Sequence, residues 1–280
     1  MDLRSAYRHC RQVAFGHYEN FPVASALLPQ PQRDAIAAVY AFARTADDFA
    51  DEPEYAPRRM GLLRDWKRRL DRAPGGDPIF TALQDACRRW RLPKALLRDL
   101  VDAFLQDCRK ARYADFRQVL GYCHRSANPV GRLVLRVFGL DTAPNLADSD
   151  AICTALQLAN HWQDLGHDVL IRDRIYLPQD EMRRHKVTVA QLKQGTFHAG
   201  TAALMRFQVD RTEAYFAQGA GLAGRLPGRL GLEIRLTVLG GRAVLAKIRG
   251  QGYDTLGRRP KLGWMDGAGL LAKALLGRSA

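Results

Sequence analysis

Paired cysteines, long apolar runs and strand patterns are missing or scarce in this 280-residue sequence. Its five cysteines (Cys10, Cys87, Cys108, Cys123 and Cys153) are odd in number and form no C-x-x-C pair, which favours buried thiols in a reducing compartment over a disulfide framework or a zinc site. Residues 1–21 contain no apolar segment typical of a secretory signal. No apolar run approaches the roughly 18 residues that would span a membrane. We therefore expect a cytoplasmic protein.

Acidic residues are also in short supply. Asp and Glu number 29 against 43 Lys and Arg, which gives a net charge of +14, and Arg outnumbers Lys by 35 to 8. Such an excess indicates an anionic partner, either phosphate, nucleic acid or a membrane surface, or else an arginine-rich coding bias on a solvated surface. No basic motif with aromatic or groove-reading geometry is present, so we do not expect nucleic-acid binding.

Strand signals are scarce, whereas apolar residues recur at helical spacing along most of the chain. Short breaks rich in Pro and Gly separate these segments, so neighbouring helices can pack antiparallel in one bundle. We predict an all-α protein with residues 1–280 in a single domain, and a lid or loop excursion at the less regular residues 170–199. The predicted helices cover roughly residues 33–51, 57–72, 78–90, 93–110, 115–138, 148–169, 200–219 and 229–250.

An acidic stripe runs along one of the apolar helices. In "YAFARTADDFADE" (40–52), helical geometry places Tyr40, Arg44, Asp47 and Asp51 within an arc of about 60°. Asp48 lies about 100° from Asp47 and about 40° outside this arc, at the edge of the stripe. The remaining residues of the helix are mostly Ala, Ile, Val and Phe. A polar stripe therefore crosses a helix that otherwise has the composition of a buried one.

A second segment repeats this arrangement. In "ALQLANHWQDLGHD" (155–168), Gln157, Asn160, Asp164 and Asp168 span an arc of about 80°, and His161 borders the same face. Apolar residues cover the other sides. Again two Asp stand four residues apart and follow amide side chains.

Carboxylates in these positions need positive charge nearby to offset their mutual repulsion and the cost of burying them. Two like charges four residues apart repel by a few tenths of a kcal/mol even when exposed, and a partly buried carboxylate costs several kcal/mol more unless it is paired. Arg44 cannot neutralise all of them. Mg²⁺ prefers hard oxygen ligands, waters and phosphate oxygens. Two facing stripes would hold Mg²⁺, bind a diphosphate and draw off its charge as it leaves.

Other interpretations stay open. A single D-x-x-x-D on a helix is commonly a solvated face. His161, Asp164, His167 and Asp168 would suit a transition metal in an all-helical phosphohydrolase, although His167 lies about 100° from Asp168 around the helix. The stretch "GAGLAG" (219–224) reads G-x-G-x-x-G but follows a helix rather than a strand, so we interpret it as an interhelical loop and not a dinucleotide site.

The two stripes, with "RIYLP" (174–178) after the second, resemble the squalene/phytoene synthase family of head-to-head prenyl synthases. The resemblance covers nearly the whole chain and is closest to one branch, the hydroxysqualene synthases of bacterial hopanoid biosynthesis. The stretches that carry it are "GHYENFPVAS" (16–25), "YAFARTADDFADE" (40–52), "YCHRSANPVGRLVL" (122–135), "QLANHWQDLGHD" (157–168), "RIYLPQDEM" (174–182) and "GYDTLGRRPKLG" (252–263).

The resemblance implies an isoprenoid-synthase-type helical bundle with a central active-site cavity. It implies that the magnesium ligands are Asp47, Asp51, Asp164 and Asp168. It also implies contacts with the substrate and its diphosphate from His17, Arg44, Asn128 and Arg174. The catalytic and supporting roles that it implies fall on Arg44, Tyr40, Gln157, Asn160 and Tyr176.

Three departures from the family are visible. Glu19 stands where related synthases have Lys, and His124 stands where many have Tyr. Those positions help the joining of two farnesyl units, so their replacement puts that half-reaction in doubt. His161 stands where the family leads us to expect an aromatic or aliphatic residue; it would contact the metal-bound diphosphate or take part in water capture.

The resemblance thus implies conversion of presqualene diphosphate and water to hydroxysqualene and diphosphate. The alternatives within the family are presqualene diphosphate, squalene and phytoene synthases. A non-enzymatic assembly or binding protein is a further alternative, against which the four retained Asp argue.

The implied substrate is an anionic amphiphile, which indicates a role for the excess of Lys and Arg. A positive face would help the protein dock on the inner face of an anionic membrane. The tail "GAGLLAKALLGRSA" (267–280) would either lie on such a surface or simply pack or fray. Neighbouring enzymes of the same pathway are the other partners we would expect.

Overall fold

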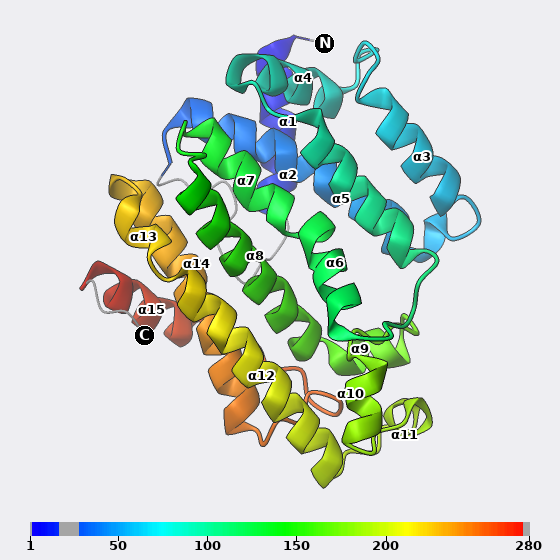
Figure 1. Cartoon of the computed structure of the whole chain (residues 1–280). Coiled ribbons are helices and arrows are strands. Elements are labelled where there is room, and N and C mark those ends of the chain that lie inside the picture. Colours follow the sequence, from blue (N-terminus) through cyan, green and yellow to red (C-terminus); the bar gives the residue numbers. More distant parts are fainter. Residues whose placement is uncertain (1, 17–27, 277–280) are drawn as a thin grey trace.

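Helices make up nearly all of the regular structure (Figure 1). The computed structural model describes residues 2–16 and 28–276, and within these ranges it contains no strand, only an isolated bridge between Arg112 and Ile175. The prediction of an all-α fold is therefore confirmed. The helices are α1 (Leu3–Gly16), α2 (Gln30–Asp51), the 3₁₀ turn η1 (Pro53–Tyr55), α3 (Arg59–Arg69), α4 (Pro78–Trp90), α5 (Lys94–Asp107), α6 (Phe116–Ser126), α7 (Asn128–Val137), α8 (Ala143–Gln163), α9 (Leu165–Leu170), α10 (Gln179–Arg184), α11 (Val189–Lys193), α12 (Ala199–Gly219), α13 (Leu222–Arg225), α14 (Gly228–Gly250) and α15 (Trp264–Leu275).

The prediction of one continuous helix over residues 115–138 is wrong. The chain forms α6 and α7 with a break at Ala127, whose φ of −121° departs from helical values. Pro129 lies in the first turn of α7. Proline fits there because its missing N–H would have no helical partner in a first turn, whereas inside a helix it breaks the hydrogen-bond ladder.

The predicted helix over residues 148–169 is also divided. α8 begins earlier, at Ala143, and ends at Gln163, and Asp164 (φ −99°, ψ 10°) separates it from α9. The Asp168 N–H still donates to the Asp164 carbonyl oxygen at 2.8 Å. The two Asp of the second stripe therefore keep an i, i+4 relationship although they do not share one regular helix.

Two further segments differ from the sequence prediction. The first is α1, an amphipathic helix that the analysis of periodicity missed and whose buried face is made of Ala6, Cys10 and Ala14. The second is residues 170–199, which contain the short helices α10 and α11 rather than only irregular chain. The bridge at Ile175 ties the start of this segment to the α5–α6 connection.

Helix α8 lies at the centre of the molecule and packs against α6, α7, α12 and α14 (Figure 1). Trp162 anchors it, because its indole N–H donates to the Thr212 hydroxyl of α12 at 2.8 Å in a fully buried position. Helix α2 is anchored separately. Phe42 stacks on Trp66 of α3 with ring centroids 5.7 Å apart, and the Trp66 indole donates to the Phe42 carbonyl at 3.1 Å. The acidic stripes belong to these two anchored helices and to α9.

Substitution of Gly166 tests how the second stripe is positioned. Gly166 lies between Asp164 and Asp168, its N–H donates to the Thr255 carbonyl, and a Cβ there would stand 2.2 Å from the Leu256 carbonyl oxygen. Because backbone must move, Gly166→Ala should lower the free energy of unfolding by about 1–3 kcal/mol, measured by urea denaturation.

The matched control is Gly121→Ala in the interior of α6, where no atom lies within 4 Å of the added methyl group. That variant should be unchanged or more stable by up to about 1 kcal/mol, since Ala is a better helix former than Gly. Equal effects of the two substitutions would contradict the close packing of residues 255–256 on α9.

Candidate active site

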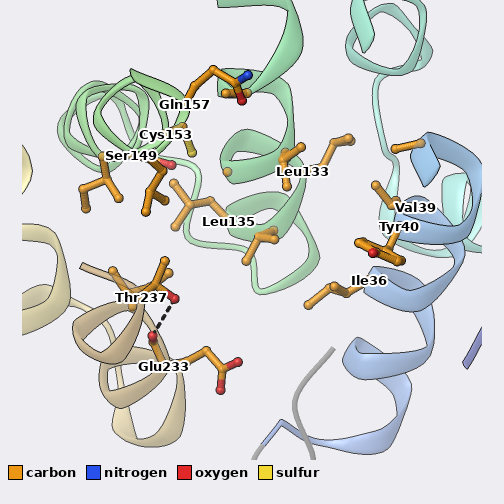
Figure 2. A pocket seen from close by; sticks show the side chains of 18 of the residues that line it. Ile36, Val39, Tyr40, Leu133, Leu135, Ser149, Cys153, Gln157, Glu233 and Thr237 are labelled. Carbon is orange, nitrogen blue, oxygen red and sulfur yellow. Dashed lines mark hydrogen bonds between the residues drawn. The ribbon is translucent and has the colours of Figure 1, made fainter. Parts of the chain in front are cut away.

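A cavity of about 330 Å³ lies between α2, α7, α8 and α14 (Figure 2), and Leu222 of α13 also lines it. Most of its lining side chains are apolar, contributed by every one of these helices. Polar side chains gather where α2 and α8 approach their C-terminal ends. These are Tyr40, Arg44, Asp47, Gln157 and Asn160. Five residues that were selected on the sequence therefore line one cavity, which is apolar along most of its length.

Arg44 neutralises part of the first stripe. Its guanidinium lies 3.3 Å from the Asp47 carboxylate and 2.5 Å from the Asp48 carboxylate. The two acids follow at i+3 and i+4, so all three side chains share one side of α2. Asp48 is thus part of the charged group, although the sequence placed it only at the edge of the stripe.

Arg172 connects the two stripes. Its Nη1 lies 2.8 Å from Oδ2 of Asp51 on α2 and 3.8 Å from Oδ1 of Asp168 on α9. Arg174 approaches Asp51 from the same segment, with Nη2 2.8 Å from Oδ1. Asp173 between them has a φ of +51°, a left-handed conformation that Asp tolerates better than most residues. Two acids from different helices are in this way brought into one buried ionic cluster.

Asp164 has a different partner. Arg259, in the segment between α14 and α15, donates to both carboxylate oxygens of Asp164, at 3.2 Å for Nη2 to Oδ2 and at a shorter distance for Nε to Oδ1. Arg259 was not among the residues selected on the sequence, although it lies in the stretch 252–263 that carries part of the resemblance. This ion pair ties the C-terminal part of the chain to the second stripe.

A buried carboxylate that the sequence analysis missed lies behind the stripes. Asp107 of α5 accepts hydrogen bonds from the hydroxyl groups of Tyr122, at 2.5 Å, and Tyr176, at 3.0 Å. The ring of Tyr176 stacks on His161 with centroids 3.6 Å apart. Tyr176, selected for a catalytic role, therefore has its hydroxyl group held by Asp107 rather than aimed at the cavity. No local pattern around Asp107 marks it, because its partners come from other segments.

The alternative metal site of two His and two Asp is not assembled. His161 is buried against Tyr176, and burial lowers its pKa to about 3, so it is neutral. His167 is 48% exposed, and its Nδ1 is 4.0 Å from Oδ1 of Asp168. The two imidazoles thus lie in different surroundings, and the transition-metal alternative is not supported.

Electrostatics show that the acids of the stripes act on one another. The pKa of Asp47 is raised to about 7, first by burial and then by the charge of Asp51. Burial also raises the pKa of Asp168 to about 7, and the charges of Asp164 and Asp51 add to this effect. Asp107 has a pKa raised to about 6 by burial. The arginines therefore do not fully compensate the negative charge that accumulates here.

This donor set fits a hard divalent cation. Among residues 2–16 and 28–276, no three His, Cys, Asp or Glu side chains lie close enough together to hold one metal ion, and arginines contact Asp47, Asp51, Asp164 and Asp168 instead. Carboxylate oxygens are nevertheless the ligands that Mg²⁺ takes, and carboxyl groups with raised pKa values gain most from added positive charge. Magnesium ligation by these four residues stays a prediction.

The residues that line the cavity do not include the selected residues Asp51, Asp164, Asp168, Arg174 and Tyr176. The other selected residues also lie apart from the lining, or outside the described chain. The Asn128 side chain is buried and accepts the Thr154 hydroxyl at 3.1 Å, which links α7 to α8. His124 is exposed on α6. His17 and Glu19 lie outside the described residues.

Comparison with known proteins gives the family. The model of the squalene/phytoene synthase family matches residues 15–266, which is most of the chain. The chain belongs to this family. The resemblance noted on the sequence is therefore confirmed, and the fold is the isoprenoid-synthase-type helical bundle.

Its relatives carry more than one activity. A hydroxysqualene synthase from Rhodopseudomonas palustris is 38% identical over 220 residues, which cover 77% of this chain and 74% of the relative. A phytoene synthase from Thermus thermophilus is 34% identical over 269 residues, which cover 95% of this chain and 91% of the relative. The crystal structure of squalene synthase HpnC from Alicyclobacillus acidocaldarius matches with a TM-score of 0.82 and 38% identity, covering 90% of this chain and 95% of that one.

Replacement of His161 should remove one source of acid sensitivity. The folded chain holds His161 neutral, with a pKa lowered from 6.5 to about 3, so the unfolded chain binds the proton more readily. This contribution to stability is present above about pH 6.5 and is lost at up to about 1.4 kcal/mol per pH unit as the pH falls towards about 3. His161→Phe keeps a ring beside Tyr176 but takes no proton.

Urea denaturation between about pH 7 and about pH 5 should therefore show a smaller loss of stability in His161→Phe than in the wild type. His124→Phe is the control, because that imidazole is exposed, and it should follow the wild-type curve. Equal pH dependence in the wild type and His161→Phe would contradict a neutral, buried His161.

Proposed function

We propose that this protein converts presqualene diphosphate and water to hydroxysqualene and diphosphate in a magnesium-dependent reaction. The observation that carries the proposal is a cavity with a charged end and an apolar body. Asp47, Arg44, Gln157 and Asn160 line the charged end. Mostly aliphatic side chains of α7, α8, α13 and α14 line the rest, with Ser149, Cys153, Glu233 and Thr237 among them. This is the division that a diphosphate joined to a long hydrocarbon requires.

The charged end is suited to a diphosphate group. Arg44 lines it from α2. Arg172 and Arg174, in the segment after α9, pair with Asp51, which lies one turn beyond Asp47 on α2. Guanidinium groups bind phosphate oxygens through paired hydrogen bonds. When held by Asp47, Asp51, Asp164 and Asp168, Mg²⁺ supplies positive charge that stabilises the departing diphosphate. The arginines that now contact these acids would then be available to the phosphate oxygens.

The apolar body of the cavity is suited to a carbocation. Breaking the C–O bond leaves both bonding electrons on the diphosphate and a cyclopropylcarbinyl cation in the cavity. Aliphatic side chains make up most of the wall and offer no nucleophile, so the cation can rearrange among them before it is captured. Glu233 and Thr237 of α14 are polar groups that line the cavity beside them. One water then adds its oxygen to the cation and gives up a proton, which yields hydroxysqualene, diphosphate and one proton. Tyr40, Gln157 and Asn160 are the uncharged polar groups near the charged end that would orient the diphosphate and that water.

Head-to-head condensation of two prenyl diphosphates, as in phytoene synthase, is the second candidate. It is favoured by the phytoene synthase from Thermus thermophilus, whose match covers 95% of this chain. The choice of hydroxysqualene rests on the branch resemblance of residues 16–25 and 122–135 and on the hydroxysqualene synthase relatives at 36% and 38% identity. A non-enzymatic role has less support, because the carboxylates and arginines of the site are all retained.

A direct assay separates these activities. The purified protein should convert presqualene diphosphate to hydroxysqualene when Mg²⁺ is present and NADPH is absent, because water and not hydride captures the cation. Farnesyl and geranylgeranyl diphosphates are supplied in parallel incubations, and the products are identified by mass spectrometry. Squalene formed only with NADPH, or phytoene formed from geranylgeranyl diphosphate, would replace the proposed function. An absence of turnover with every substrate would favour the non-enzymatic role.

Substitution of one acid tests the site itself. Asp168→Asn removes a charge from the buried cluster with Asp51 and Arg172, so turnover should fall by about 100-fold or more, the cost of losing a charged transition-state stabiliser. The control is Asp173→Asn, five residues on, whose exposed carboxylate contacts Arg112 and Lys193 and whose turnover should stay near the wild-type value. Near-normal turnover of Asp168→Asn, with folding checked by circular dichroism, would rule out its predicted role.

A further inference from the structure

The C-terminal helix presents its apolar side chains to solvent. Eleven large apolar side chains are exposed in the described ranges, and five of them belong to α15 and the residue after it: Trp264, Met265, Leu271, Leu275 and Leu276. Trp264 is 84% exposed and Leu275 66%. A helix that packed its apolar stripe into a core would show the opposite arrangement.

These side chains form one continuous face. At about 100° per residue, Leu271, Trp264, Leu275, Met265 and Leu276 fall within an arc of about 140° that contains no charged residue. Lys273 lies about 60° beyond one edge of this arc and the buried Ala274 about 60° beyond the other. Asp266 lies nearly opposite the arc, towards α14. The sequence analysis placed the candidate surface tail at residues 267–280. The helix instead begins at Trp264, and this start adds the exposed side chains of Trp264 and Met265.

Positive charge surrounds this face. Residues 220–276 contain ten Lys and Arg against three Asp and Glu, a net charge of +7. Four of these ten pair with acids outside this range, namely Arg225, Arg242, Arg249 and Arg259. Lys261 and Lys273 are exposed next to and on the helix, and Arg229 is exposed at the start of α14. An anionic surface is the complementary partner.

The helix α15 also covers the outside of the cavity wall. It lies beside α14 (Figure 1), where Lys247 pairs with Asp266 at 3.0 Å and Arg235 donates to the Ala274 carbonyl at 2.8 Å. Arg235 is adjacent to Ile234 and two residues from Glu233 and Thr237, and these three side chains line the cavity. The exposed apolar face and the hydrocarbon-sized cavity thus lie on opposite sides of one helix.

We infer that α15 is a membrane-surface helix, which lies in the plane of an anionic lipid bilayer with Trp264, Leu271 and Leu275 between the lipid headgroups. A helix of 12 residues is about 18 Å long, shorter than the roughly 30 Å of a bilayer core. No helix in the described part of the chain is long and apolar enough to cross a membrane. An apolar face with a tryptophan and flanking basic residues is the pattern of interfacial helices.

A second copy of the chain is a poorer occupant of this face. Pairing through α15 would bring the exposed Lys261 and Lys273 of two copies together, and like charges facing each other oppose association. Anionic lipid headgroups neutralise the same charges instead. Binding to lipid does not depend on the proposed reaction, so it can be tested without turnover.

Vesicle flotation tests the inference. The full chain should float with vesicles of phosphatidylcholine and phosphatidylglycerol, and less with phosphatidylcholine alone or at high salt, where the surface charges are screened. The double variant Leu271→Glu with Leu275→Glu should lower the fraction bound by at least about tenfold, since two apolar anchors become charged. The matched control is Leu3→Glu with Phe207→Glu, which adds the same two charges at exposed positions on α1 and α12.

The tryptophan provides an independent readout. Trp264 is the one exposed tryptophan of the four, because Trp66 and Trp162 are buried and Trp90 is half-buried. Brominated lipids should therefore quench wild-type fluorescence through Trp264, whereas Trp264→Phe should still float but lose this quenching.

Three results would overturn the inference. The first is no flotation with either kind of vesicle, and the second is undiminished flotation of the α15 double variant. The third is self-association, measured by sedimentation velocity without lipid, that the α15 variant abolishes and the control variant does not. That result would assign the face to a second copy of the chain.

Discussion

Arg172 lies between Asp51 of α2 and Asp168 of α9, and the arrangement of the site depends on this contact. Burying carboxylates from two helices side by side costs several kcal/mol unless each has a partner. Arg172 and Arg174 supply partners to Asp51, while Arg44 and Arg259 supply them to Asp47 and Asp164. The raised pKa values of Asp47 and Asp168 show that this compensation is incomplete. The fold thus holds negative charge that a divalent cation and a diphosphate would balance.

The lining of the cavity beside this cluster changes along the helices that form it. Both α2 and α8 place charged or amide side chains towards their C-terminal ends, and the lining side chains before them are mostly apolar. The cavity between them consequently changes from charged to hydrocarbon-like along its length. On the far side of α14, one wall of the cavity, α15 carries an apolar face. A substrate with an anionic head and an isoprenoid body matches this order of surfaces. The ionic cluster and the apolar surfaces belong to the same helical bundle.

The acidic stripes could be predicted from the sequence because both carry carboxylates at i, i+4 on otherwise apolar helices. The break at Asp164 could not, since apolar periodicity continues through it into α9. Arg172 is four residues after Asp168, and this i, i+4 spacing could have identified it as a partner of that acid. Asp107 could not be found in this way, because its partners Tyr122 and Tyr176 come from other segments. The exposure of the apolar face of α15 could not be predicted either. Amphipathic spacing predicts a helix, but it does not say whether the apolar face packs on the protein or faces its surroundings.

Diffraction from crystals grown with Mn²⁺ and inorganic diphosphate tests the central claim most directly, because Mn²⁺ takes the same oxygen ligands as Mg²⁺ and gives an anomalous signal. The account predicts anomalous peaks within coordination distance of the Asp47 and Asp51 carboxylates and of the Asp164 or Asp168 carboxylate, with the diphosphate between the two stripes and in contact with Arg44, Arg172 or Arg174. Diphosphate and Mn²⁺ bound away from these acids, with the ion pair of Arg172 and Asp51 intact, would contradict it.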